Sequence, residues 1–439
     1  MKTTPMVSPV LMPVYAFALT IGIGAICLRL PQACTAPLSW IDALFTATSA
    51  VCVTGLVVVD TATAFTSIGQ SIIMILIQLG GLGIMTYTSL IIYLWRRRVS
   101  LKDRLAVGGA LLGDPRFHLG KFLTQITTIV LSIELFGFLF LLAGGMNFFD
   151  ALFHSISAFC NAGFSLHTEN LMGFHYNYLI QFIIMLLIFL GGIGFYVIVD
   201  IYDWIRTKHP LGWQSRVVLL TSLWLILGGG LVLAIAEKSG HQELSWMQAI
   251  WDGFFHAVSA RTAGFNTVDL SKMTDVSLLF LIILMFIGGS PASCAGGIKT
   301  TTARVLWSFA IAQIKGRRQS VVAGFAVDSS TINKTMSLLI CSFLLLILAI
   351  VTLMILEGGA SPHGSARTVF LEIVFEAVSA FGTVGLSVGI TPSLGVGSKA
   401  VLIALMFVGR IGPMLLITFL QTWQTPEHFA WPEKNLSIG

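Results

Sequence analysis

The sequence predicts an all-α polytopic membrane protein in which four similar units surround one axis. Of its 439 residues, 56% are hydrophobic and only 10% are charged. The apolar residues form long blocks, and one of them, Thr335–Leu356, holds no charged residue. Blocks of about 20 apolar residues match the thickness of a bilayer core, whereas soluble domains carry roughly 25% charged residues. The composition therefore argues against an ordinary soluble enzyme. The unbroken blocks argue against a transmembrane β-barrel, whose strands alternate.

A nine-residue pattern occurs four times and divides the chain into repeats. An acidic residue begins each copy and a Ser-Ala pair ends it, at Asp42–Ala50, Asp150–Ala158, Asp252–Ala260 and Glu372–Ala380. A glycine and a bulky apolar residue follow each copy, and the third copy is one residue shorter before its glycine. A second pattern recurs further on, as Gly80-Gly81, Gly191-Gly192, Gly288-Gly289 and Gly409-Arg410. Such internal similarity indicates four copies of one supersecondary unit.

Each repeat is predicted to contain an outer helix, a short amphipathic helix, a glycine loop and an inner helix. The outer helices are expected at about Pro9–Leu28, Lys121–Ala143, Arg216–Ala236 and Asn333–Leu356, and the inner ones at about Ser71–Trp95, Tyr178–Ile201, Val276–Ile314 and Lys399–Trp423. This gives eight transmembrane helices, with repeat boundaries at 1–98, 99–208, 209–318 and 319–439, the last including a carboxyl-terminal tail.

The short helices suggest how the four units are arranged. A helix of about ten residues reaches only half-way through a bilayer, and irregular backbone at that depth must line a cavity or be buried in protein. The pattern therefore predicts four M1–P-loop–M2 repeats around one pseudo-four-fold pore. The alternative is four amphipathic helices on the membrane surface. The absence of Lys and Arg before the loops disfavours it.

Charge placement predicts the orientation. The connections after the first three inner helices are rich in Lys and Arg, within 96–121, 206–216 and 304–334. Because cytoplasmic loops carry such an excess, these connections and both termini are expected on the cytoplasmic side of the cell (inner) membrane. The opposite side carries many carboxylates, Asp60 and Glu169 among them, and an acidic mouth concentrates cations. The lipid bilayer is an expected partner, and nucleic acid is not.

The glycine loops share backbone features rather than side-chain chemistry. Glycine adopts positive φ without steric cost, so it helps to turn successive carbonyls the same way. Four such loops around an axis would present carbonyl oxygens that replace the hydration shell of a cation. The candidate ion-binding residues are Val53, Thr54, Gly55, Asn161, Ala162, Gly163, Thr262, Ala263, Gly264, Thr383, Val384 and Gly385.

Backbone oxygens suit a hard monovalent cation better than a transition metal, which prefers imidazole or thiolate. The six cysteines form no CxxC pair or Cys/His cluster, so no transition-metal site is expected. The short helices also direct the negative ends of their dipoles at the loops, which favours a cation again.

Three motifs carry a resemblance to a known family. The segments Thr48–Leu56, Ser259–Thr267 and Ala295–Thr302 resemble those of the Trk/Ktr/HKT potassium transporter superfamily, and the eight spans beginning near residue 1 are most similar to its KtrB-type membrane subunits. The resemblance implies K⁺ uptake rather than an enzymatic activity. It also implies a homodimer with one pore per chain and a cytosolic nucleotide-binding regulatory ring of the KtrA or TrkA type.

The resemblance also bears on which ion is selected. The family's filter glycine falls on Gly55, Gly163, Gly264 and Gly385. Plant relatives that favour Na⁺ often have serine in the first position, so Gly55 argues for K⁺ selectivity. Whether Na⁺ serves as a coupling or activating ion stays open.

The third inner helix is predicted to be interrupted by a gate. Glycines, a proline and small polar residues weaken a helix there, at Gly288, Gly289, Ser290, Pro291, Ser293, Gly296 and Gly297. We expect an intramembrane loop below the filter that obstructs the pore when closed, as the family resemblance also implies. The alternative is a kinked helix with a packing role.

Arg410 occupies a slot that is glycine in the other three repeats. A charge at membrane depth usually faces a cavity or a partner, so Arg410 is expected beside the gate. There it could pair with gate carbonyls, repel cations or act as a structural anchor.

Other residues and functions leave alternatives open. Glu134, alone in an apolar helix, is either a coupling-ion or proton site or one end of a hydrogen bond between helices. Lys299 follows the gate and is expected toward the cytoplasm, where a structural or interfacial role is one interpretation and the role stays open. His154 and His256 occupy a slot of the short helices that holds Thr46 and Glu376 in the other repeats, and this variety favours packing or capping over metal binding. A Na⁺- or H⁺-coupled transporter of another monovalent cation is one competing function. A membrane electron-transfer protein is another, but it would require paired histidines within helices.

Overall fold

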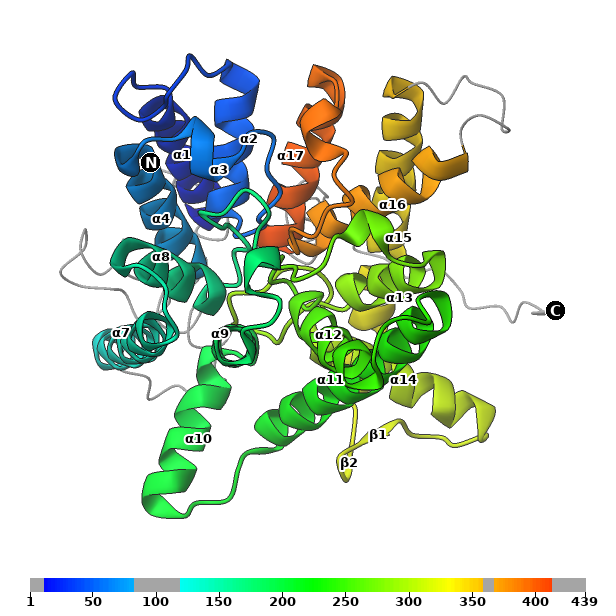
Figure 1. Cartoon of the computed structure of the whole chain (residues 1–439). Helices are drawn as coiled ribbons and strands as arrows, with labels where there is room; N and C mark the ends of the chain where they lie inside the picture. The colour runs from blue at the N-terminus through cyan, green and yellow to red at the C-terminus, as the bar shows by residue number, and fades with distance from the viewer. Residues whose placement is uncertain (1–11, 83–118, 358–366, 413–439) are drawn as a thin grey trace, which may run out of the picture.

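The computed structural model describes residues 12–82, 119–357 and 367–412, and its helices follow one order four times (Figure 1). An outer helix, a short helix and an inner helix succeed one another in each unit. In chain order they are α1 (Met12–Leu28), α2 (Trp40–Val51), α4 (Ser67–Gly81); α7 (Leu119–Ala143), α8 (Phe148–Phe159), α9 (Tyr178–Gly192); α11 (Trp213–Gly240), α12 (Trp246–Ser259), α13 (Asp275–Phe286); α15 (Ser329–Leu356), α16 (Arg367–Gly382), α17 (Val396–Ile411).

Smaller elements connect these helices. They are α3 (Thr61–Ala64), η1 (Met172–Phe174), α10 (Phe195–Thr207), η2 (Leu270–Lys272), α14 (Thr300–Ile314) and η3 (Thr391–Ser393). A two-stranded hairpin, β1 (Val321–Val322) and β2 (Phe325–Ala326), pairs antiparallel with Val321 opposite Ala326.

The four short helices occupy the centre of the molecule. The residue three places after the first acidic position is fully buried in each copy, and in all four it is a phenylalanine: Phe45, Phe153, Phe255 and Phe375. Two of these helices begin at well-formed caps. Ser39 accepts a hydrogen bond from the Asp42 N–H, and Ser245 forms a capping box with Gln248. Ser39 and Ser245 are exposed, so the repeated pattern places one apolar anchor per unit in the core while these two helices begin at the surface.

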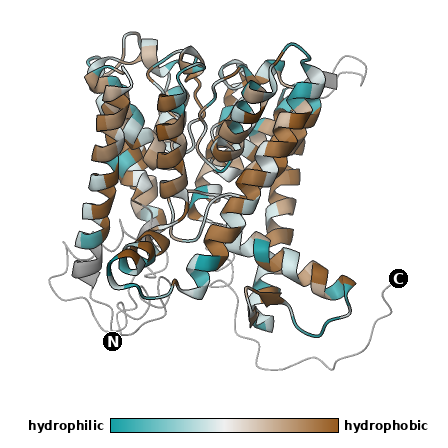
Figure 2. Ribbon diagram, turned by 60° about the horizontal axis from the view of Figure 1, so that its bottom comes forward, coloured by the Kyte–Doolittle hydropathy of each residue, from teal (hydrophilic) through white to brown (hydrophobic). Residues whose placement is uncertain are grey.

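The outer helices surround this centre and expose apolar side chains. Trp224 of α11 is 75% exposed and Leu348 of α15 is 68% exposed. Figure 2 shows hydrophobic residues along the length of these helices and hydrophilic residues gathered near their ends. Such an apolar exterior on long helices is typical of contact with lipid.

Part of the expected set of membrane spans is visible in the described ranges. Three helices there are long and apolar enough to cross a bilayer, at Thr124–Ala143, Trp213–Gly240 and Ser329–Leu356. A fourth span results if the bent pair α9 and α10 is counted as one. The predicted residues of the first and fourth inner helices beyond 82 and 412, and the carboxyl-terminal tail, lie outside the described residues.

The second inner helix differs from the sequence prediction. The sequence predicted one helix over Tyr178–Ile201, which was wrong: α9 ends at Gly192 and α10 leaves it at an angle of 102°. Gly194 has φ +91°, a conformation that residues with a Cβ rarely adopt. The carbonyls that the break releases are used by another unit, as described below.

The third inner helix is also broken. It ends at Phe286, and α14 begins at Thr300. The intervening segment contains the expected gate residues 288–297. Its two ends are joined by a bridge between Ile287 and Ile298 and by a 2.9 Å hydrogen bond from the Gly288 N–H to the Ile298 carbonyl. The interruption is therefore an ordered loop whose ends lie side by side.

Candidate functional site

The four glycine loops share an unusual backbone conformation. In each loop the glycine and the residue two places before it have positive φ, which is uncommon for residues other than glycine. The pairs are Val53 (56°) and Gly55 (91°), Asn161 (60°) and Gly163 (70°), Thr262 (72°) and Gly264 (75°), and Thr383 (49°) and Gly385 (90°). The residue between the two is not among those with positive φ, so the sign of φ alternates through each loop. The shared backbone conformation is thus not confined to the glycines.

The loops contact one another in a closed ring. A Cβ atom added to Gly55 would lie 3.0 Å from the Cα of Gly163. The same construction gives 2.9 Å from Gly163 to Gly264, 3.1 Å from Gly264 to Gly385 and 2.9 Å from Gly385 back to Gly55. Each added Cβ would also come within 3.0 Å of the carbonyl oxygen of the residue before the next glycine in the ring. Real Cβ atoms essentially never come so close to another heavy atom. The four oxygens belong to Thr54, Ala162, Ala263 and Val384. The backbone thus leaves no space for a side chain at these four positions.

A repeated serine holds each loop. The Ser49 hydroxyl accepts a 3.0 Å hydrogen bond from the Gly55 N–H, and Ser379 does the same for Gly385 at 3.1 Å. Ser157 and Ser259 instead donate to the carbonyls of Phe164 and Phe265, at 2.8 and 2.5 Å. All four serines are fully buried. Their role was not predicted from the sequence, although their constant position in the four repeats was a signal for it.

The residues at the position shared by His154 and His256 make local hydrogen bonds. The side chains of Thr46, His154 and His256 are hydrogen-bonded at 2.8 Å to the carbonyl oxygen four residues earlier. In the fourth unit Glu376 instead accepts hydrogen bonds from Ser387 and Thr391, beyond the glycine loop. His154 reaches the matching Ser165 at 2.9 Å. The contacts of His154 with Ser165 and of Glu376 with Ser387 and Thr391 connect a short helix to the segment that follows its loop.

The Gly-Gly pattern allows the inner helices to approach the loops. A Cβ on Gly80, Gly191 or Gly409 would collide with the carbonyl at the end of the short helix of the same unit, at Val51, Phe159 and Phe381 respectively. The third unit differs, because Gly288 faces the Gly296 carbonyl of its own gate segment. In the other three units the inner helix packs directly against the end of the short helix. In the third unit the segment 288–297 packs at the corresponding glycine instead.

A cavity opens on the other side of the ring. It measures about 230 Å³, and all four units line it, through residues that include Gly55, Asp60, Gly163, Glu169, Asn266 and Gly385. Thr168 donates a 2.9 Å hydrogen bond to Asp60 and so joins the first two units across the opening. The cavity therefore leads from an acidic rim to the four glycines.

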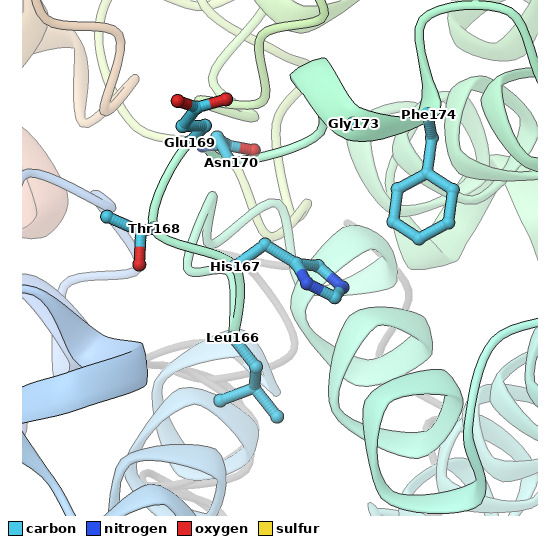
Figure 3. Close-up of a pocket in the computed structure, with 7 residues that line it drawn as sticks. All are labelled: Leu166, His167, Thr168, Glu169, Asn170, Gly173 and Phe174. Atoms are coloured by element: carbon cyan, nitrogen blue, oxygen red, sulfur yellow. The ribbon is translucent and has the colours of Figure 1, made fainter.

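A neighbouring cavity of about 520 Å³ is formed by the second unit alone. Figure 3 shows its seven lining residues, Leu166, His167, Thr168, Glu169, Asn170, Gly173 and Phe174, with the His167 ring directed toward Phe174. The centroids of these two rings are 5.2 Å apart. Because His167 to Asn170 line both cavities, this loop forms the wall between them.

The expected gate segment, residues 288–297, is anchored to the second unit. The Ser290 N–H donates to the Gly192 carbonyl at 3.0 Å, and the Cys294 N–H donates to the Gly191 carbonyl at 3.2 Å. In return the Phe195 N–H donates to the Ala292 carbonyl at 3.0 Å. The break between α9 and α10 thus supplies the backbone partners that hold the loop of the third unit.

The remaining gate residues face inward or stabilise the loop. A Cβ on Gly296 would collide with the Thr383 side chain, and one on Gly297 would lie 3.3 Å from the Gly382 Cα. Ser293 donates to the Ser290 carbonyl at 2.6 Å, while Gly289 and the Pro291 carbonyl pack near the second inner helix. Ser290, Cys294 and Ile298 are almost completely buried. The segment therefore lies against the inner side of the fourth glycine loop.

Arg410 joins three units. Its guanidinium donates hydrogen bonds to the Cys294 carbonyl in the gate segment and, at 2.5 Å, to the Gly80 carbonyl at the end of α4. The side chain is 7% exposed. Lys299 binds the same loop, since its Nζ donates to the Ala295 carbonyl at 2.6 Å. Two cationic side chains thus donate hydrogen bonds to backbone carbonyls of the segment 288–297.

Glu134 lies between the first and second units. It is 5% exposed, and its carboxylate accepts a 3.3 Å hydrogen bond from Gln78 of α4. Its backbone carbonyl accepts a hydrogen bond from Ser155 of α8 at 2.6 Å. This geometry is that of an interhelical hydrogen bond, while the ion or proton interpretation stays untested.

The resemblance seen in the sequence is confirmed by comparison with known proteins. A family model described as TrkH, cation transport protein, matches residues 11–426. The Ktr system potassium uptake protein B of Bacillus subtilis is 40% identical, with 96% of this chain and 95% of the relative covered. The potassium/sodium uptake protein NtpJ of Enterococcus hirae is 33% identical, with 98% and 97% covered.

The fold has a solved counterpart. The crystal structure of the potassium transporter TrkH from Vibrio parahaemolyticus aligns with a TM-score of 0.74, covering 97% of this chain and 88% of that one at 19% identity. At that identity the likeness concerns the fold alone. With a family model that spans nearly the whole sequence and relatives covered over almost their full length, the chain belongs to the TrkH family of cation transport proteins.

Proposed function

We propose that this chain is the K⁺-translocating membrane subunit of a K⁺ uptake system, with one pseudo-four-fold pore between its four units and eight transmembrane helices. The observation that carries the proposal is the closed ring of glycines, in which Gly55, Gly163, Gly264 and Gly385 approach one another without room for a Cβ. Backbone oxygens gathered at such a ring are suited to replace the water around an alkali cation. The candidate filter residues are the twelve predicted from the sequence.

The ion pathway begins in the acidic cavity. Cations accumulate near Asp60 and Glu169 because a cleft with one sign of charge focuses the field. They then exchange water for loop carbonyls, of which those of Thr54, Ala162, Ala263 and Val384 lie closest to the ring. The inner side of the ring is where the gate segment would stop them.

K⁺ is the preferred cargo on two grounds. Several full-length relatives carry names of potassium uptake proteins, and the first filter position is Gly55 rather than serine. One relative is named a potassium/sodium uptake protein. That name keeps Na⁺ as a second candidate, either as cargo or as a coupling or activating ion.

The segment 288–297 acts as the gate in this proposal. Its hydrogen bonds to Gly191 and Gly192 and its contact with Thr383 support a position across the inner mouth of the filter. Arg410 acts as a latch, because it bridges the gate and the end of α4. A purely structural anchoring role for Arg410 is the alternative.

The setting of the pore is part of the same proposal. The chain resides in the cell membrane with both termini in the cytoplasm, as the basic connections suggest. It forms a homodimer, and a cytosolic nucleotide-binding ring of the KtrA or TrkA type regulates it. The Ktr-system names of the relatives support an assembly of more than one subunit.

Growth rescue tests the proposal. The full chain is expressed in a cell that lacks its own K⁺ uptake systems, and growth is measured at low K⁺ with and without added Na⁺. Rescue without Na⁺ supports K⁺ translocation, and rescue only with Na⁺ identifies a coupling or activating ion. Normal membrane expression without rescue under either condition would contradict the proposal.

The selectivity of uptake between Rb⁺ and Na⁺ provides a second test of the proposal. A Ser at position 55 would press its Cβ against the second loop at Gly163 and the Ala162 carbonyl, and the ring would loosen. We expect Gly55→Ser to retain uptake but to lower the ratio of Rb⁺ to Na⁺ uptake. An unchanged ratio would argue that the ring does not select the ion.

A further inference from the structure

Helix α10 carries an apolar stripe that is covered at its start and bare at its end. Val197, Ile201, Trp204 and Ile205 recur with helical spacing and form one face. Val197 is 2% exposed because it packs against Val218 of α11. Two turns later, Trp204 is 46% and Ile205 62% exposed. The stripe therefore extends beyond the edge of the helix bundle, and large apolar side chains remain uncovered.

The direction of α10 indicates what covers this face. The helix leaves α9 at 102°, and Figure 1 shows α9 nearly end-on while α10 lies across the view. In the proposed function α9 is the membrane-crossing part of the second inner helix, so a helix perpendicular to it lies parallel to the bilayer plane. Amphipathic helices in this orientation insert their apolar face into the boundary between headgroups and acyl chains.

The end of α10 carries the matching charges. Arg206 and Lys208 are both exposed and follow the apolar stripe directly. Aromatic residues such as Tyr202, which is 51% exposed, are typical of the membrane interface. Juxtamembrane basic residues are attracted to the anionic surface of the cytoplasmic leaflet. Both features fit a lipid surface.

We propose that α10 docks on the cytoplasmic surface of the bilayer, with Tyr202, Trp204 and Ile205 in the interface and Arg206 and Lys208 on anionic phospholipid headgroups. A protein occupant fits less well, because a stable protein interface uses about 20–30 residues a side and the bare stripe spans two helical turns. The neighbouring surface of α11, which exposes Leu220 and Leu223, continues the apolar face toward the bilayer core.

This docking is coupled to the gate segment, an extension that rests on the proposed function. The first residue of α10, Phe195, donates its N–H to the Ala292 carbonyl of the gate. Gly194, which directly precedes α10, packs against the Pro291 carbonyl. Movement of α10 about Gly194 therefore shifts the point to which the loop is tied. With α10 held on anionic lipid, the loop keeps the position described above, and ion flux is lowered.

Quenching of a label locates the helix without reference to transport. An environment-sensitive fluorophore is attached to Ile205→Cys or to Asp203→Cys, in a background with Cys27 and Cys341 replaced by Ser. Position 203 lies on the opposite face of α10 and serves as the control. In vesicles of phosphatidylcholine and phosphatidylglycerol, we expect spin-labelled lipid to quench position 205 and aqueous iodide to quench position 203.

Two results of this experiment would overturn docking. Equal iodide quenching at both positions would place α10 in water. Protection of position 205 that depends on protein concentration, but not on lipid, would assign the stripe to a second copy of the chain. Neither result would bear on whether the chain transports K⁺.

Rb⁺ flux in proteoliposomes tests the coupling. We expect flux through the unregulated chain to fall when phosphatidylglycerol is added to phosphatidylcholine, and the response to disappear in the double variant R206Q/K208Q. The control K315Q/R317Q removes two exposed charges from another cytoplasmic segment and should retain the response. No lipid response in the wild type, or equal loss in both variants, would refute the coupling.

A last variant separates docking from coupling. Proline is tolerated at the first position of a helix, so Phe195→Pro removes the N–H that binds Ala292 while α10 can persist. Label quenching at position 205 should stay as in the parent, and the lipid response should be lost. A retained response would show that this hydrogen bond does not transmit the effect.

Discussion

Asp42 and Lys399 form an ion pair that joins the first short helix to the last inner helix. The carboxylate oxygen and Nζ are 2.8 Å apart, and the side chains are 19% and 12% exposed. The two residues are 357 positions apart in the sequence. The pair therefore closes the seam where the first and the fourth unit meet.

The seam should stabilise the fold at neutral pH. Burial tends to raise the pKa of Asp42, but hydrogen bonds from Lys399 and Ser39 outweigh it, so the pKa lies below its ordinary value. A depressed folded-state pKa contributes stability above the unfolded value of 3.8, and the contribution is lost as pH falls through the folded pKa. Asp42→Asn should cost about 1–2 kcal/mol at pH 7, measured as a lower thermal midpoint in detergent.

An exposed ion pair provides the control for this prediction. Lys272 and Asp269 are 3.3 Å apart but 80% and 39% exposed, so Lys272→Met should change the midpoint little. Equal effects of the two substitutions would mean that the seam is no stronger than a surface pair.

The ring predicts a sharp difference between two nearby glycines. Gly385 and Gly389 both have positive φ, at 90° and 101°, but only Gly385 faces another loop; nothing lies within 4 Å of a Cβ on Gly389. Both substitutions to Ala carry the backbone cost of about 1–2 kcal/mol. Gly385→Ala should also loosen the ring and lower the ratio of Rb⁺ to Na⁺ uptake, whereas Gly389→Ala should leave this ratio unchanged at matched expression. The same ratio in both variants would remove the argument for a tight ring.

Arg410 should control flux through the gate. Arg410→Ala leaves the Cys294 and Gly80 carbonyls without a donor, so the loop loses its link to α4. We expect a higher Vmax of uptake without the regulatory ring and a smaller change for Arg410→Lys, which keeps the charge but loses one of the two contacts. Unchanged Vmax in both, with normal thermal stability, would reduce Arg410 to a residue without a gating role.

Shortening the gate tests the obstruction directly. Deletion within Ser290–Gly296 removes the backbone that bonds to Gly191 and Gly192. Flux through the chain alone should rise. Reduced flux in a variant that elutes normally in gel filtration would contradict an obstructing segment.

Glu134 separates two interpretations. Glu134→Gln keeps the size and hydrogen-bonding capacity that Gln78 uses but removes the ionisable group. If the carboxyl only links helices, uptake should keep its pH and Na⁺ dependence, and the loss of stability should stay within about 1 kcal/mol. A flattened pH or Na⁺ profile would instead identify a proton or coupling-ion site. The hydrogen-bond geometry favours the first outcome.

Much of the local architecture was readable from the sequence. The outer helices α7, α11 and α15 each begin and end within four residues of the predicted bounds, because long apolar blocks are a local property of the sequence. The short helices and their glycines could also be predicted, because each copy repeats the same local pattern. The break at Gly194 was missed, because the run from Tyr178 is apolar on both sides of it.

The sequence by itself determined the class of the protein, the four copies, the glycine positions and the weak segment in the third inner helix, all of which depend on residues close together in the chain. Only the tertiary structure decided that the glycines close a ring, that the released carbonyls at Gly191 and Gly192 hold a loop of the next unit, and that Arg410 reaches Gly80. These contacts join residues about 100 or more positions apart. Packing of whole helices sets them, and no short-range pattern encodes which partner a buried carbonyl or guanidinium will find.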